Sequence, residues 1–382
     1  MRILHTGDIH LDSAFCAYGA RDAERQREAG RALLRRIFGC AAKEGAQLIL
    51  ISGDLFDSRF VSPETGELFC ALVEECGIPV VVSPGNHDPY FENSFYAKAA
   101  ERLGDKLFVF TSPELQIFDI DSLRVRVFGY AFTSAALSES PLSGAEMPQD
   151  NGYTRIFCGH GDIFSPVSRY APITENELRK FDFAYAALGH VHNAWNAEKM
   201  GGRARYCGFG EGRSFDELGD GGVWIVNIDS ESFTCERRIL SNKAFYILKL
   251  GLCSEDTLSS AKERICGQIK EQNYSLNAHL RLILEGVAQE NLVKELLTAT
   301  QEICSDCGLE YLELLDRVMP VLDGEYLERD TTLRGELYRV LRPKLMSSDN
   351  EERARAIKAL KIGLAAIDGR SIFGADEKGV WV

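Results

Sequence analysis

The chain has 382 residues, of which 45% are hydrophobic and 26% charged, the composition of a folded protein with about two or three domains. Its 43 Lys and Arg residues against 57 Asp and Glu residues give a formal net charge of −14 at pH 7. A surface this acidic excludes general polyanion binding, so any nucleic acid must meet a local basic patch or metal ions. No apolar run approaches the roughly 18 residues of a membrane span, and the opening MRILHTGDIH predicts a strand rather than a secretory signal. We therefore expect a cytoplasmic protein without membrane contact.

The 11 cysteines are scattered along the chain, and their odd number without a signal peptide argues against a disulfide framework. Cys304 and Cys307 form one CxxC pair with no second pair after it. Such a pair is compatible with half of a zinc site, but two small apolar residues at a helix end are the favoured interpretation. We expect reduced, packed thiols.

The first 240 residues alternate strands with helices and then become rich in strands. Strands are predicted at 2–6, 47–52 and 78–83, and helices at 23–44, 63–76 and 94–103. This βαβαβα order implies parallel strands joined by crossover helices. Further strands are predicted at 107–110, 115–120, 124–130, 155–159, 185–188, 203–207, 222–228 and 233–238. The succession indicates a second sheet within one domain spanning 1–240.

The sequence changes character near residue 240. A small α/β domain is predicted over 244–320, with strands at 245–250, 279–285 and 309–318 and helices at 255–272 and 289–304. Residues 329–382 form a last segment, with helices at 332–345 and 350–367. Within 329–370 basic residues outnumber acidic ones by 10 to 6, against the trend of the whole chain. The last helix carries an apolar stripe that packs on its own domain or docks on a partner, formed by Ile357, Leu360, Leu364 and Ile367.

Five short polar segments each follow a predicted strand, and each contains glycine. They are Gly7-Asp8-Ile9-His10, Gly53-Asp54, Gly85-Asn86-His87-Asp88, Gly159-His160-Gly161 and Gly189-His190-Val191-His192. The carboxyl ends of the strands in an open α/β sheet share one edge, so these polar side chains are expected to converge there. Glycine at these points permits sharp turns and close approach of the backbone to a bound group.

The residue types in these segments point to metal ions. Imidazole and carboxylate ligands without thiolate suit Mn²⁺, Fe²⁺ or Zn²⁺, and they are too many for a single ion. A two-metal site with a shared carboxylate fits better, because such a pair polarises a phosphoryl group and activates water near neutral pH. The five segments together therefore predict phosphoester hydrolysis.

In this order, GDIH, GD, GNHD, GH and GHVH resemble the signature of the calcineurin-like metallophosphoesterases over residues 1–240. Within that superfamily, HTGDIHLDSAF, GDLFDS and YCGFGEGRSFDEL resemble the bacterial SbcD- and YhaO-type DNA repair exonucleases. The resemblance implies an α/β (α+β) fold, a four-layer α/β/β/α sandwich with a small α/β cap domain and C-terminal helices.

The resemblance also implies roles for individual residues. Asp8, His10 and His192 would hold one ion, Asn86, His160 and His190 a second, and Asp54 both; Mn²⁺ is the expected metal. His87 would face the substrate as the acid that protonates the leaving oxygen or as a group that steadies the transition state. For Asp88 (orienting His87) and Asp57 (supporting a ligand), a loop-capping role is an equal alternative. Arg213 would contact a phosphate or, alternatively, form a structural salt bridge.

Three functions remain open at this point. The favoured one is a Mn²⁺-dependent DNA repair nuclease, a 3′→5′ exonuclease on duplex ends with single-strand endonuclease activity. By resemblance, residues 244–320 would contact DNA, residues 329–382 would bind an SbcC-like ATPase with a coiled coil, and the chain would dimerise. A phosphodiesterase or phosphatase for small molecules is the second, and GNHD without GDxxDRG argues against a protein phosphatase. A non-catalytic adaptor is disfavoured because every expected ligand position is filled.

Overall fold

The computed structural model describes residues 1–16, 19–149, 152–193, 202–229, 232–274, 277–321 and 324–367 and residue 369. The chain divides into two compact units, Met1–Phe245 and Tyr246–Val382. None of the described helices is long and apolar enough to cross a bilayer.

The N-terminal unit is built on a six-stranded sheet with the order β11-β10-β1-β2-β3-β4. Four parallel strands form most of it: β1 (Arg2–Thr6), β2 (Leu48–Ile51), β3 (Val80–Val82) and β4 (Leu107–Val109). The other two, β10 (Gly222–Ile228) and β11 (Phe233–Ile239), are antiparallel additions at the β1 edge. The sequences LILI of β2 and VVV of β3 are wholly buried, as expected for strands covered on both faces.

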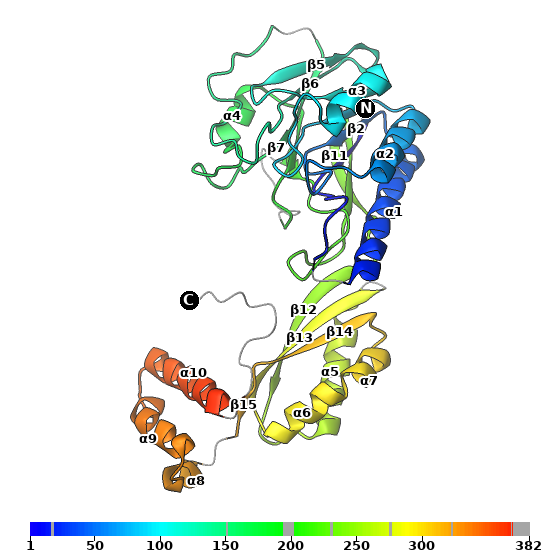
Figure 1. Ribbon diagram of the computed structural model, residues 1–382. Helices are drawn as coiled ribbons and strands as arrows, with labels where there is room; N and C mark the ends of the chain where they lie inside the picture. The colour runs from blue at the N-terminus through cyan, green and yellow to red at the C-terminus, as the bar shows by residue number, and fades with distance from the viewer. Residues whose placement is uncertain are drawn as a thin grey trace. The chain divides into compact units, whose positions relative to one another are not determined.

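Alternate residues of the central strands face two different cores. Ile49 and Ile51 of β2 pack against the helices α1 (Ala20–Glu44), α2 (Pro63–Cys76) and α3 (Phe95–Leu103), which lie along one side of this unit in Figure 1. Leu48 and Leu50 face the other way, toward the second sheet. The period of two along a strand therefore places a helix layer and a sheet layer on opposite faces.

The second sheet has the order β5-β6-β7-β8-β9. Its strands are β5 (Gln116–Ile120), β6 (Val125–Gly129), β7 (Thr154–His160), β8 (Tyr185–Gly189) and β9 (Ala204–Tyr206). On the face away from the first sheet, aromatic residues pack with Leu178 of the short helix α4 (Glu175–Lys180). The predicted α/β/β/α layering is confirmed, although α4 and the single-turn helices η1 (Gly104–Lys106) and η2 (Asp121–Leu123) were not predicted.

The C-terminal unit contains a four-stranded sheet and six helices among its described residues. The strands are β12 (Ala244–Leu252), which begins at the unit boundary, β13 (Ala278–Ala288), β14 (Tyr311–Asp316) and β15 (Met319–Pro320). The helices are α5 (Leu258–Glu271), α6 (Glu290–Thr298), α7 (Thr300–Asp306), α8 (Gly324–Arg329), α9 (Leu333–Leu345) and α10 (Asn350–Ile367).

Two details of this unit differ from the sequence prediction. The helix predicted at 289–304 is two helices, because the chain leaves helical geometry at Ala299, between α6 and α7. α8 was not predicted. Of the apolar stripe on α10, Leu360 and Leu364 are buried against α8 and α9, whereas Ile357 and Ile367 are 37% and 40% exposed. Half of the stripe therefore packs on its own unit.

Candidate metal centre

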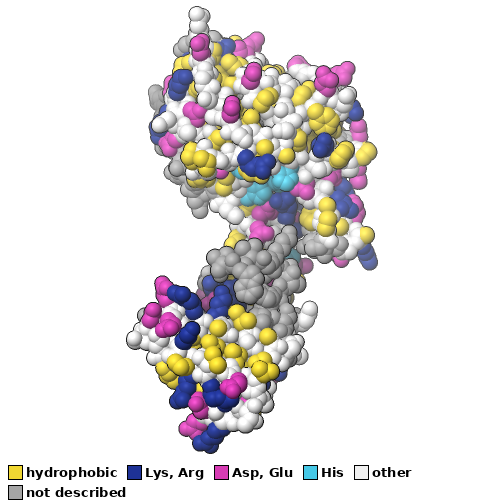
Figure 2. Space-filling model, turned by 60° about the vertical axis from the view of Figure 1, so that its left-hand side comes forward, with side chains coloured by type: hydrophobic (Ala, Val, Ile, Leu, Met, Phe, Trp, Pro, Cys, Tyr) yellow, Lys and Arg dark blue, Asp and Glu magenta, His cyan; other side chains and the backbone are white. Residues whose placement is uncertain are grey.

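The five polar segments follow β1, β2 and β3 of the first sheet and β7 and β8 of the second. Neighbouring strands within each set are parallel, so their carboxyl ends lie at one edge. Three residues from three different strands, Asp8, Asp54 and His160, bring one ligand atom each within 4.8 Å of one another. All three side chains are buried. In Figure 2 histidine side chains gather in one patch on the surface of the N-terminal unit.

The backbone at this edge is held in uncommon conformations. Asp8, His10, Asp54 and His190 have φ angles of 47°, 51°, 46° and 103°, a region that residues other than glycine seldom adopt. Such conformations persist only where the surrounding structure enforces them, and they cluster at functional sites. At Gly85 a Cβ atom would collide with Asp54 Oδ1, so only glycine allows this close approach.

Three histidines are oriented in the same way. The Nδ1 atoms of His10, His160 and His192 lie 2.9 Å from Asp57 Oδ1, 3.0 Å from the Ser52 carbonyl oxygen and 2.8 Å from Glu217 Oε1. An acceptor at Nδ1 keeps a proton there and makes Nε2 the nitrogen through which the ring can bind a metal. These Nε2 atoms turn inward: that of His10 is 3.3 Å from that of His192, and that of His160 is 3.0 Å from Asn86 Oδ1.

Two buried carboxylates lie among these nitrogens. Asp8 Oδ2 accepts hydrogen bonds from the His190 backbone N–H (2.9 Å) and from Cys207 Sγ (3.1 Å). Asp8 Oδ1 is buried without a hydrogen-bond partner in the described part of the chain, 3.6 Å from His192 Nε2. Asp54 Oδ2 is 3.4 Å from His160 Nε2 and 3.8 Å from His10 Nε2. Asp54 thus lies between the two predicted sets of ligands.

The electrostatics of the cluster favour a cation. Burial raises the pKa of the Asp54 carboxyl well above its usual value, and the negative charges of Asp88 and Asp8 raise it further. A divalent ion would offset this repulsion and would satisfy the orphaned Asp8 Oδ1. The donor set of carboxylate oxygens and imidazole nitrogens therefore fits divalent metal ions.

The histidines differ in their proton affinity. Burial lowers the pKa of His10 to about 4, and burial together with His160 lowers that of His190 to about 4. Both are neutral at pH 7, the form that binds metals. Burial also opposes protonation of His192, but the carboxylates of Asp8 and Glu217 raise its pKa to about 10. A metal bound at His192 would therefore displace a proton.

His87 lies at the edge of the centre and is accessible from outside. Its side chain is 45% exposed, its ring packs edge-on against His10 with centroids 4.8 Å apart, and its Nδ1 is 3.2 Å from the Asp57 carbonyl oxygen. Its backbone N–H donates to Asp54 Oδ1 at 2.9 Å, which fixes the loop over the centre. The imidazole is placed to contact a substrate.

Asp88 was expected either to orient His87 or to cap a loop, and its contacts are those of a loop cap. The buried Asp88 carboxylate accepts hydrogen bonds from the backbone N–H groups of Phe56 (3.1 Å) and Gly85 (2.7 Å) and from the Tyr96 hydroxyl (2.5 Å). It ties two ligand loops together, which is the loop-capping alternative.

The comparisons with known proteins agree with this geometry. Residues 1–194 match the family model described as calcineurin-like phosphoesterase. The chain is a calcineurin-like phosphoesterase. It is 27% identical over 335 residues to the metallophosphoesterase YhaO of Bacillus subtilis, covering 79% of this chain and 78% of that protein. It is 25% identical over 309 residues to the SbcD subunit of the SbcCD nuclease of Staphylococcus epidermidis, covering 72% and 77%.

Two solved structures align with this phosphoesterase over nearly their whole length. They are TT1561 of Thermus thermophilus (TM-score 0.39, 11% identity, 63% of this chain and 98% of that one) and a dimetal phosphatase from Danio rerio (TM-score 0.41, 14% identity, 63% and 96%). By family and by its clustered ligands, the chain is a phosphoesterase hydrolase that uses divalent metal ions.

Arg213 of this phosphoesterase forms salt bridges, which is the second of the two roles considered for it. Its Nη2 is 2.6 Å from Glu217 Oε1 and its Nη1 is 3.5 Å from Asp57 Oδ1. Because these carboxylates contact His192 and His10, the guanidinium steadies both histidines through their hydrogen-bond partners. Glu217 was not predicted as a site residue, although it lies in the GEGRSFDEL segment. The one feature of the sequence that could have indicated its role is its negative charge four residues after Arg213.

Proposed function

We propose that this phosphoesterase is a Mn²⁺-dependent DNA repair nuclease. It would act as a 3′→5′ exonuclease on duplex ends, with endonuclease activity on single strands. The observation that carries phosphodiester hydrolysis is the buried Asp54 carboxylate between inward-turned imidazole Nε2 atoms, with the exposed His87 beside them. The staphylococcal SbcD relative, named as part of a nuclease, supports DNA as the substrate.

In this proposal one ion would be held by Asp8, His10 and His192, the other by Asn86, His160 and His190, and Asp54 would contribute to both. When bound, the ions polarise the phosphoryl group and lower the pKa of water. His87 donates a proton to the leaving oxygen or stabilises charge on the phosphate in the transition state. Asp57 keeps His10 and His87 in place, since its carboxylate contacts the first and its carbonyl oxygen the second. No covalent enzyme intermediate is expected.

Features of the C-terminal segment favour binding to a partner protein. The proposal assigns residues 329–382 to an ATPase subunit of the SbcC type, the small domain 244–320 to DNA contact, and dimer formation to the whole chain. Leu333, Val340 and Met346 on and beside α9 are 73%, 70% and 73% exposed, which is unusual for large apolar residues without a partner. Residues 370–382 of this assignment lie outside the described residues.

The test is digestion of end-labelled linear duplex DNA by the purified chain, with Mn²⁺ or with chelator, beside the His87→Ala variant. Bis-(p-nitrophenyl) phosphate runs in parallel. Metal-dependent shortening of the DNA that the variant lacks is the expected result. Hydrolysis of the diester with DNA left intact, also after addition of an SbcC-type ATPase, would favour a small-molecule enzyme. No hydrolysis of either substrate by metal-loaded protein would favour an adaptor.

A further inference from the structure

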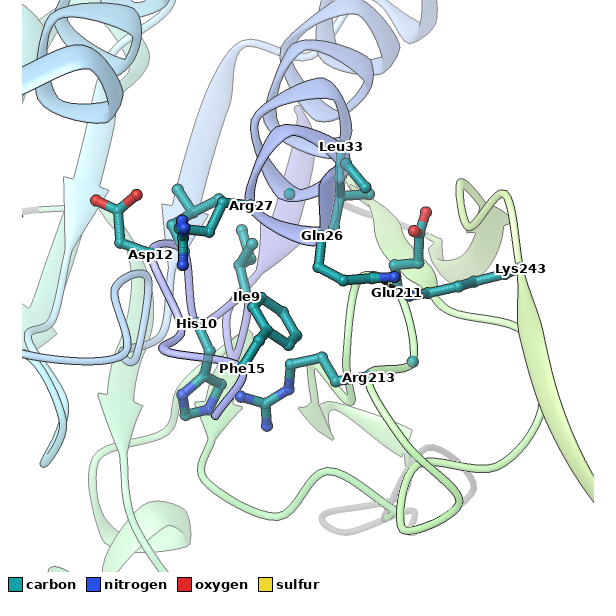
Figure 3. A pocket seen from close by; sticks show the side chains of 14 residues that line it. Ile9, His10, Asp12, Phe15, Gln26, Arg27, Leu33, Glu211, Arg213 and Lys243 are labelled. Carbon is teal, nitrogen blue, oxygen red and sulfur yellow. Dashed lines mark hydrogen bonds between the residues drawn. The ribbon is translucent and has the colours of Figure 1, made fainter. Parts of the chain in front are cut away.

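A small cavity adjoins the metal centre and is not explained by metal binding. It shares His10 and Arg213 with the centre and extends to Phe15, Gln26 of α1 and Lys243, as Figure 3 shows. Its volume is about 30 Å³, room for about two water molecules. A group of this size is an oxyanion rather than a nucleobase.

The ammonium group of Lys243 lines this cavity without a direct ion pair, and the carboxylates of Glu211 and Glu217 act on it from a greater distance. Lys243 Nζ donates to Gln26 Oε1 at 2.5 Å, a neutral partner, and lies 5.7 Å from the centre of the Phe245 ring. Within the described residues it forms no ion pair with a carboxylate. Of the other charged groups lining the cavity, Arg27 pairs with Glu24, Glu211 with Arg36 and Arg213 with Glu217. The remaining one, the Asp12 carboxylate, accepts hydrogen bonds from the Ser62 N–H and the Thr65 hydroxyl.

An anion entering the cavity would contact the Lys243 ammonium group directly. Burial lowers the pKa of Lys243, which means that its ammonium group has lost hydration that a ligand could replace. An acidic protein that binds DNA also needs cations at the site itself, since the net charge of the chain is −14. The Gln26 amide N–H groups provide further donors beside Lys243.

We propose that Lys243 and Gln26 bind the phosphate group next to the phosphodiester that is cut. This inference rests on the proposed nuclease function. It names the subsite by which the enzyme would distinguish a nucleic acid strand from a simple phosphodiester. Because His10 lines both the cavity and the metal centre, an anion in the cavity would lie next to the centre.

The experiment compares thymidine dinucleotides that contain one internal phosphodiester and differ only in an extra terminal phosphate. These are dTpdT, pdTpdT and dTpdTp. For the wild-type chain, kcat/KM should be about tenfold higher for one of the two phosphorylated forms than for dTpdT. In Lys243→Gln this ratio should fall toward one. Lys43→Gln, an exposed charge at the far end of α1, is the matched control and should keep the wild-type ratio.

A binding measurement separates this inference from the proposed function. Calorimetric titration of the same dinucleotides into chelator-treated protein should show preferred binding of one phosphorylated form, lost in Lys243→Gln. If the wild-type chain cleaves none of the dinucleotides yet shows this preference, the nuclease proposal fails and the subsite stands. An equal loss for all three dinucleotides, or an unchanged ratio, would mean that Lys243 only ties β12 to α1.

A second inference concerns the CxxC pair, which the metal centre leaves unexplained. Cys307, just after α7, lies 2.9 Å from Cys266 of α5, sulfur to sulfur, whereas Cys304 faces the Leu309 carbonyl oxygen at 3.3 Å. All cysteines are free thiols in this structure. A disulfide requires a sulfur separation of about 2.05 Å, so the two sulfur atoms must approach one another further to form one.

We infer that a peroxide converts Cys266 and Cys307 into a disulfide joining α5 to the end of α7. One sulfur attacks the peroxide oxygen, giving a sulfenic acid and the first water; the second sulfur displaces the hydroxyl as the second water. Two thiols are oxidised and one peroxide is reduced.

Intact and peptide mass spectrometry of the full chain after hydrogen peroxide treatment tests this bond. The expected product lacks two hydrogen atoms, links the peptides of Cys266 and Cys307, and is reversed by dithiothreitol. Cys304→Ala should behave like wild type, and Cys266→Ser should not form the link. A Cys304–Cys307 bridge, or sulfinic acid without any link, would overturn the inference.

Discussion

The candidate metal centre of the N-terminal unit and the C-terminal unit differ in how their charged side chains are paired. At the centre, Asp8 and Asp54 are buried beside one another, and one oxygen of Asp8 has no hydrogen-bond partner among the described residues. In the C-terminal unit, Lys262 and Glu302 of the helices and Arg281 and Glu313 of the sheet form ion pairs, both at 2.6 Å. The first region keeps charge for a ligand that the chain does not supply, and the second uses charge for stability.

The largest effect should come from Asp54→Asn. The substitution removes the carboxylate between the two sets of ligands, so bound metal should fall below that of wild type and phosphodiester hydrolysis by about 10³-fold or more. Metal analysis and hydrolysis of bis-(p-nitrophenyl) phosphate measure both losses. Asp105→Asn, a carboxylate outside the centre, is the control.

The thermal stability of the same variant in the presence of chelator tests whether Asp54 is reserved for a metal ion. Because the pKa of Asp54 is raised by burial and by neighbouring carboxylates, removing its charge relieves repulsion that no ion offsets. Metal-free Asp54→Asn should therefore unfold at a temperature equal to or above that of metal-free wild type. Calorimetry showing marked destabilisation would mean that Asp54 is a structural group rather than a reserved ligand.

His87→Ala should lower kcat by about 10²- to 10⁴-fold without a change in metal content. The exposed imidazole contacts His10 by its ring and is not required to hold an ion in our assignment. Loss of metal together with activity would instead make His87 a ligand, which its place with His10 and Asp54 in one cluster allows.

Removing the support of a ligand should have a smaller effect. Asp57→Asn and Glu217→Gln keep the shape of the groups that hold His10 and His192 but weaken the charge on the acceptor. Metal affinity should fall about 10- to 100-fold, with activity restored by added Mn²⁺. A competition titration with a chelating dye measures this shift, and activity that stays low at saturating metal would contradict a purely supporting role.

The sequence predicted the ligand-bearing loops because glycine and polar residues after buried strands are local signals. It could not identify Glu217 or the Ser52 carbonyl oxygen, since partners of a histidine Nδ1 come from distant segments and any residue has a carbonyl. The sequence left two roles open for Asp88 for a related reason: its neighbour in sequence is His87, but its carboxylate accepts hydrogen bonds from the Phe56 N–H and the Tyr96 hydroxyl. The break at Ala299 has no proline or glycine to mark it.

The smallest effect expected lies in the C-terminal unit, at Asp256. This carboxylate accepts hydrogen bonds from the Cys253 N–H (2.8 Å), Ser260 Oγ (3.1 Å) and Arg264 Nη1 (2.7 Å), and thereby fixes the start of α5. Asp256→Asn should destabilise α5 by about 1–2 kcal/mol at pH 7. Hydrogen exchange of α5 peptides, followed by mass spectrometry, measures this loss in the full chain.

The stabilisation of α5 by Asp256 should depend on pH in a definite direction. Burial opposes ionisation of Asp256, but its hydrogen bonds lower the pKa from 3.8 to about 2. A carboxylate whose pKa is depressed in the folded state stabilises it above pH 3.8, and this contribution is lost as the pH falls through 3.8 toward 2. The difference between wild type and Asp256→Asn, corrected for intrinsic exchange, should therefore shrink over that window. A constant difference would mean that the shape of the side chain, rather than its charge, supports α5.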